Sequence, residues 1–235
     1  ADYFWGWGVD AEAQAGRMGQ MLYAVALKRR GGFDFRAPTQ ADLDAVAAAE
    51  AELARKRPLW EARDVIPTEA FPQGNDMRPA LYGMPIWSDF FSPRQLLAMG
   101  TAIETLSELR PEIHKALGEK RAPAIEAYLS LMMDKMVIYN NRLCRFDPSR
   151  GLRSNFDRHD FAFVWSHGEF DASANLMPWA ISQVADAYKD MADLLVSAPV
   201  QLGGTVVERG PLTQIQGSAA RLAALPDASV DVIVT

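Results

Sequence analysis

The residues best suited to chemistry lie in a loop of this chain between Asn140 and His159. Arginine outnumbers aspartate there, which gives the loop a local charge of +3, and asparagines and phenylalanines are interleaved with them. Arginine can clamp a phosphate through two hydrogen bonds, asparagine can read an adenine edge, and an aromatic ring can stack on an extruded base. We therefore expect DNA contacts from Asn140, Asn141, Arg142, Arg145, Arg150, Arg153, Asn155 and Arg158. The alternative is a solvated loop whose arginines pair with carboxylates of the same chain.

The overall charge restricts this prediction to a local surface. The chain has 235 residues, a net charge of −6 and a pI near 5.1, so it is not an electrostatic nucleic-acid binder as a whole. Hydrophobic residues make up 49% and charged residues 23%, which excludes a largely disordered, collagen-like or disulfide-rich protein. No apolar run approaches the roughly 20 residues that span a bilayer, and no signal peptide is visible. We expect a cytoplasmic protein with no membrane partner.

Other reactive side chains are few. Cys144 is the single cysteine, so no disulfide or cysteine-rich zinc site can form within the chain, and a buried small hydrophobe is its simplest role. The three histidines lack metal-ligand spacing. His167 and Glu169, with Asp171 nearby, could form an acid/base pair, although a polar loop is the simpler interpretation. No Ser-His-Asp signature or phosphate-binding loop is present.

Helices are expected to hold the arginine-rich loop in place. Thr39 is a plausible N-cap for a helix that Pro58 should end, and Ser92 opens another through a capping box with Gln95. Pro111 should end that second helix. A short helix over 112–117, a longer one over 122–143 with a methionine-rich apolar stripe, and another over 178–196 should follow. We interpret the methionine stripe as core and not as a binding groove.

The remaining segments flank these helices. Alternating apolar residues around Gly31 and Gly32 predict a hairpin over 20–36, and five prolines make 58–91 a long irregular connection that its aromatic residues should pack down. Beyond residue 199 the pattern predicts strands at 205–207, 212–215 and 230–234, with a short helix over 219–225. A strand, a glycine turn, a helix and a buried strand make half of a βαβ unit, whose ligand edge lies at the ends of its strands.

The run from Thr213 to Thr235 resembles the segment that precedes the catalytic motif of amino-group DNA methyltransferases. Its Leu-Pro-Asp-Ala-Ser-Val-Asp-Val-Ile-Val-Thr end is similar to the string that leads into Asp-Pro-Pro-Tyr in that family. The resemblance implies methyl transfer from S-adenosylmethionine to N6 of a flipped adenine, with cofactor contacts at Gly217 and Ser218. The family often has an acidic residue where this chain has Ser218. The catalytic motif itself would follow Thr235, so no catalytic residue is assigned here.

Upstream runs extend the resemblance over most of residues 33–235. They include 87–98 and 139–150, and they are similar to the large insertion of bacterial adenine-specific DNA methylases found in anti-phage gene clusters. The expected fold is α+β and mainly helical. It comprises an N-terminal segment with a hairpin (1–36), a helical insertion (37–198) and the first strands of a Rossmann-like methyltransferase sheet (199–235).

The same resemblance indicates that this chain is an internal segment of a longer enzyme. We expect double-stranded DNA as the partner of that enzyme, and we expect the segment alone neither to bind S-adenosylmethionine nor to methylate DNA. The alternative is a noncatalytic module that docks onto proteins of a bacterial defence complex. A third alternative is that the chain is part of an unrelated α/β enzyme.

Overall fold

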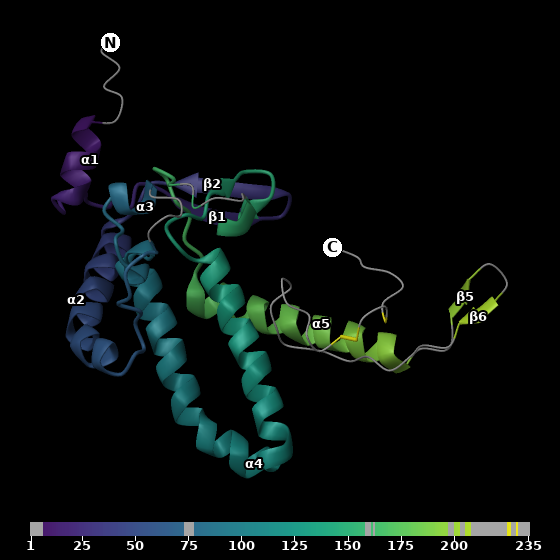
Figure 1. Ribbon diagram of the computed structural model, residues 1–235. Coiled ribbons are helices and arrows are strands. Elements are labelled where there is room, and N and C mark those ends of the chain that lie inside the picture. The colour runs from purple at the N-terminus through teal and green to yellow at the C-terminus, as the bar shows by residue number, and fades with distance from the viewer. Residues whose placement is uncertain are drawn as a thin grey trace. The chain divides into compact units, whose positions relative to one another are not determined.

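Figure 1 shows the computed structural model of the chain. It describes residues 7–72, 78–157, 161, 163–196, 200–202, 205–207, 225, 226 and 229. The contacts define two compact units, one within residues 1–188 and one within 189–235. The helices are α1 (Trp7–Gln14), α2 (Gln40–Ala62), α3 (Arg78–Leu81), η1 (Trp87–Phe90), α4 (Pro93–Tyr139), η2 (Asn155–Asp157), η3 (Ala172–Leu176) and α5 (Met177–Val196). The strands are β1 (Val25–Arg29), β2 (Gly32–Arg36), β3 (Phe146–Asp147), β4 (Gly151–Leu152), β5 (Val200–Leu202) and β6 (Thr205–Val207).

The described part of the chain is mainly helical, as the sequence predicts, and its strands form antiparallel pairs. α5 confirms the helix expected over 178–196, and β6 confirms the strand at 205–207. Nearly all of the expected elements at 212–215, 219–225 and 230–234 lie outside the described residues. The Rossmann-like sheet therefore stays a prediction. In the described residues, no helix is long and apolar enough to cross a membrane.

Helix α2 begins as predicted but does not end where expected. Asp42 Oδ2 accepts a hydrogen bond of 2.7 Å from the Thr39 backbone, which completes the capping box. Pro58 does not end the helix, which continues to Ala62. A proline inside a helix costs about 3 kcal/mol. Burial of Trp60, which lies in a core cluster with Leu53, offsets that cost by holding the last turn in place.

Helix α4 is a helical hairpin. Ser92 and Gln95 form the predicted capping box, and the helix then runs through Pro111, so the break expected at that proline is wrong. The chain reverses instead at Gly118, where φ is 70° and ψ is 167°, and Figure 1 shows the two resulting arms side by side. Backbone with this φ strains any residue that carries a Cβ, whereas glycine adopts it freely. The second arm ends at Tyr139.

Three apolar clusters hold the first unit together. Methionines of both α4 arms pack with Leu176 and Ala180, which confirms that the methionine stripe is core: Met99, Met132, Met133 and Met136. A second cluster joins α2 to the start of α4 through Trp60, Ile66 and Leu96. A third buries Phe71, Met84 and Phe90 of the irregular connection together with Leu143, which follows α4. The connection after α2 is therefore packed down, as expected.

Two small hairpins lie against each other beside these helices. β1 pairs with β2, with Val25 opposite Arg36 and Lys28 opposite Phe33, which confirms the hairpin expected over 20–36. β3 pairs with β4 across a turn at residues 148–150. Phe146 of β3 meets Phe33 edge to face, with ring centroids 4.9 Å apart, and meets Phe35 in the same way at 5.5 Å. The arginine-rich loop is therefore attached to the N-terminal hairpin by aromatic contacts.

Candidate nucleic-acid interface

The tip of the arginine-rich loop is a tight turn that displays Arg150. Asp147 Oδ1 accepts hydrogen bonds from the Ser149 backbone (2.8 Å), the Ser149 hydroxyl (2.7 Å) and the Arg150 backbone (3.3 Å). These hydrogen bonds lower the pKa of Asp147. The Asp147 carboxylate therefore stabilises the turn. The Arg150 side chain is exposed and forms no ion pair with any described residue. An exposed guanidinium on a fixed turn can contact a phosphate.

Two further arginines share one carboxylate. Arg145 and Arg153 both form ion pairs with Asp157, and the Arg153 backbone donates a 2.9 Å hydrogen bond to the Arg145 carbonyl. Hydrogen bonds from Arg153 and then Arg145 lower the pKa of Asp157 to about 2. The alternative in which arginines pair within the chain therefore describes these two residues. The Arg145 side chain is still 45% exposed.

The base of the loop is built into the fold. Asn140 is 1% exposed, and its Oδ1 accepts hydrogen bonds from Gln95 Nε2 (3.2 Å) and from the Phe170 backbone (2.9 Å). Asn141 is 3% exposed and donates from Nδ2 to the Val137 carbonyl at 2.8 Å. Neither asparagine presents its amide to a base in this structure.

The other predicted contact residues divide between buried and undescribed positions. Arg142 Nη1 donates a 2.8 Å hydrogen bond to the Asp89 carbonyl, and burial lowers the pKa of Arg142. Asn155 has a buried Oδ1 that accepts no hydrogen bond from any described residue. Arg158 and the predicted cofactor contacts Gly217 and Ser218 lie outside the described residues. Within the described loop, Arg145, Arg150 and Arg153 are therefore the arginines left to face a ligand.

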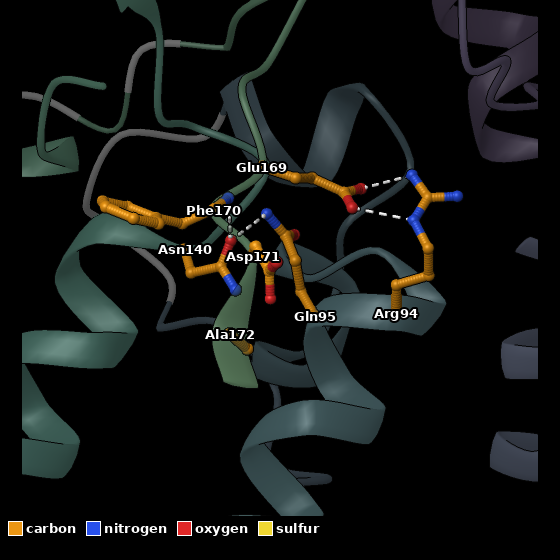
Figure 2. A pocket seen from close by; sticks show the side chains of 7 residues that line it. All are labelled: Arg94, Gln95, Asn140, Glu169, Phe170, Asp171 and Ala172. Atoms are coloured by element: carbon orange, nitrogen blue, oxygen red, sulfur yellow. Dashed lines mark hydrogen bonds and ion pairs between the residues drawn. The ribbon is translucent and has the colours of Figure 1, made fainter. Parts of the chain in front are cut away.

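A small pocket lies between the start of α4 and the segment before η3. Its volume is about 310 Å³, and it is lined by Arg94, Gln95, Asn140, Glu169, Phe170, Asp171 and Ala172. Figure 2 shows the Arg94 guanidinium facing the Glu169 carboxylate through two contacts, of 2.8 and 2.7 Å. The sequence does not predict this role of Arg94, because 75 residues separate it from Glu169 and no local pattern links them.

Glu169, one member of the acid/base pair considered from the sequence, lines this pocket. His167 Nε2 lies 3.5 Å from Glu169 Oε1. Burial alone would raise the pKa of Glu169, but hydrogen bonds from His167, Arg94 and Ser92 lower it to about 2. A carboxylate held ionised this strongly is poorly matched to proton transfer near neutral pH. The arrangement favours a structural ion pair over a catalytic one.

Cys144 is the small hydrophobe that the sequence predicts. It is fully buried, and burial raises the pKa of its thiol to about 11. We expect no reaction with a disulfide reagent at pH 8 in the native protein, and rapid reaction in guanidinium chloride, because the thiolate is the reactive form. Absorbance of the released thiol gives both rates. A native rate equal to that of free cysteine would contradict the assignment.

No group of three or more His, Cys, Asp or Glu side chains in the described segments could hold a metal ion. No family model, no curated protein and no solved structure matches the chain.

Proposed function

We propose that this chain is part of an S-adenosylmethionine-dependent DNA adenine-N6 methyltransferase, and that its helical part contacts the DNA backbone. The methyltransferase assignment is supported by the resemblance of the run from Thr213 to Thr235 to the segment before the catalytic motif. In this proposal Gly217 and Ser218 lie at the cofactor edge of the sheet. In the family that this run resembles, the Asp-Pro-Pro-Tyr motif holds the flipped adenine.

The DNA contact rests on one observation, the exposed Arg150 on the locked turn between β3 and β4. Arg145 lies at the base of the same short hairpin and keeps part of its guanidinium exposed. Phosphate contacts of this kind fix the position of a protein on DNA without reading sequence. The loop would therefore orient the enzyme, while base selection lies elsewhere.

Replacing Arg150 with alanine in the full-length protein tests this role. We expect duplex affinity to fall about 3- to 10-fold, and the slope of log K against log salt to lose about 0.9, because one phosphate contact disappears. The control is Arg121→Ala, which removes an equal charge from an exposed position on the second arm of α4. Fluorescence anisotropy with a labelled duplex measures both quantities. An unchanged salt slope in Arg150→Ala would contradict the DNA contact.

A separate experiment, an assay of methyl transfer, tests the methyltransferase assignment. The full-length protein should transfer a labelled methyl group from S-adenosylmethionine to adenine in duplex DNA, detected as N6-methyladenine after digestion. A protein that binds neither duplex nor cofactor would contradict the proposal.

A noncatalytic docking module is the second candidate. It is favoured by Trp165, which is 68% exposed and packs edge to face on Phe163 beside Tyr82. An exposed aromatic cluster of this kind suits a protein interface. If Trp165→Ala releases a co-purifying partner while Arg150→Ala leaves DNA binding intact, docking becomes the better account.

A further inference from the structure

The arginine-rich loop and the N-terminal hairpin form one surface. Phe33 and Phe35 of β2 both contact Phe146, and a Cβ added at Gly151 would lie 3.2 Å from the Phe33 ring. The backbone next to Arg150 is therefore in close contact with the hairpin. We call the exposed parts of β1–β2 and β3–β4 the two-hairpin surface.

The strand register places a second cation on this surface. Lys28 is directly opposite Phe33 in the antiparallel pair, so both side chains project from the same face of the hairpin. That face is the one that meets Phe146 and Gly151. Arg30 follows in the two-residue turn that links β1 to β2. The hairpin that carries Lys28 and Arg30 therefore lies against the β3–β4 hairpin that carries Arg150.

These cations form no ion pair within the described residues, although Arg150 lies near enough to Asp147 to help lower the pKa of that carboxyl. Lys28, Arg30 and Arg150 are all exposed, and none forms an ion pair with a described residue. Arg29 differs, because its Nε lies 3.1 Å from Asp34 Oδ2. In a chain whose net charge is −6, Lys28 near the end of β1, Arg30 in the turn after it and Arg150 in the β3–β4 turn form a local basic patch.

We propose that the β1–β2 hairpin is a second phosphate-contacting element, and that Lys28 and Arg30 bind the backbone of the same DNA duplex as Arg150. This inference rests on the proposed function, since it extends the DNA contact of that loop. It assigns a role to a segment whose sequence pattern predicts only a hairpin.

The chemistry of the surface favours a duplex over other anionic partners. Duplex DNA offers one negative charge per about 1.7 Å of its axis, which suits cations spread over two adjoining hairpins. Binding of a single strand relies on aromatic side chains that stack on bases. Here Phe33 and Phe146 meet edge to face and join the two hairpins to each other, and Phe35, although 54% exposed, also packs edge to face on Phe146. None of the three cations lines the pocket described above, and cations spread over two hairpins suit an extended backbone better than a small anion.

The test compares three variants of the full-length protein by anisotropy with a labelled duplex over a range of salt. These are Lys28→Ala/Arg30→Ala, Arg150→Ala, and the control Lys115→Ala/Lys120→Ala, which removes two exposed charges near the Gly118 corner. We expect the hairpin variant to bind about tenfold more weakly near 0.1 M salt, with a salt slope smaller by about 2, and the control to be unchanged. Circular dichroism should show native helix content in all three.

The outcomes separate the two proposals. Loss of affinity in Arg150→Ala but not in Lys28→Ala/Arg30→Ala overturns this inference and leaves the proposed function standing. No effect of either variant on a duplex that the protein does bind overturns the DNA contact of both hairpins. An equal loss in the Lys115→Ala/Lys120→Ala control shows a general charge effect and also overturns the inference. Weaker binding of an acidic peptide, with duplex binding unchanged, overturns it in favour of a protein partner.

Discussion

Replacement of Trp60 by alanine should lower the free energy of unfolding by about 3–5 kcal/mol, the largest effect we expect of any single substitution in this chain. Trp60 is completely buried between α2 and α4. Its Nε1 also donates a hydrogen bond of 3.1 Å to Glu104 Oε1. Alanine would leave a cavity and remove the donor to that carboxylate. Urea unfolding followed by circular dichroism at 222 nm measures the loss without relying on tryptophan emission.

Two substitutions provide the comparison. Trp165→Ala removes an indole that is 68% exposed, so it should change the unfolding free energy by less than about 1 kcal/mol. Gly100→Ala tests the same contact from the other side, because its new Cβ would lie 2.4 Å from Trp60 Cζ3. Overpacking of this kind costs about 1–3 kcal/mol, and the cost should shrink in the Trp60→Ala background. Equal losses from Trp60→Ala and Trp165→Ala would show that this cluster does not hold α2 on α4.

The second large loss of stability is expected from removal of the Arg94 guanidinium. Arg94→Met should cost about 2–4 kcal/mol at pH 7, because it leaves the mostly buried carboxylate of Glu169 without its bidentate partner. The matched control is Arg55→Ala, which breaks an exposed pair with Glu52 and should cost at most about 0.5 kcal/mol. Urea midpoints at constant ionic strength measure both changes. A loss in Arg94→Met no larger than in Arg55→Ala would contradict the structural role of this pair.

The same pair predicts how stability depends on acid. The folded pKa of Glu169 is lowered from 4.5 to about 2, so its contribution is fully present above pH 4.5 and is lost as pH falls from 4.5 towards 2. In Arg94→Met the folded pKa of Glu169 should rise, and the loss between pH 5 and 2.5 should become shallower. Glu169→Gln should remove this part of the pH dependence altogether. An unchanged acid profile in both variants would assign the acid sensitivity to other carboxylates.

Local sequence signals predicted the boundaries that depend on neighbouring residues. Thr39, Ser92 and the glycines after Arg30 act through hydrogen bonds and dihedral angles of adjacent residues, so their consequences are visible in the sequence. Pro58 and Pro111 were misleading because tertiary packing outweighs the local cost of a proline. Gly118 was the better signal for the reversal, since only its positive φ makes the corner possible without strain.

In the candidate site, contacts between residues far apart in sequence were likewise not predictable from local patterns. The arginine-rich composition of the loop predicts a basic surface. The pairing of Arg145 and Arg153 with Asp157 could not be predicted in this way, because it depends on how the loop folds back on itself. The burial of Asn140 depends on Gln95, which is 45 residues away. The contact between Phe33 and Phe146 joins the two hairpins. The sequence separation of these two residues is more than half the length of the first unit. No periodicity or motif encodes such distances.

The single-glycine corner of α4 has a consequence for the order in which the protein folds. Contacts between its arms join residues only 16 apart near the corner, where Arg110 meets Glu126, and 45 apart at the open end, where Gln95 meets Asn140. The entropy lost on loop closure is smallest for the shortest sequence separation. Contacts between the arms can therefore form first near Gly118 and then progressively toward the open end. The hydrogen bonds that seat Asn140, and with it the base of the arginine-rich loop, then form last. The surface around Arg150 that we propose as a DNA contact would then be complete only after the two arms have closed along their whole length.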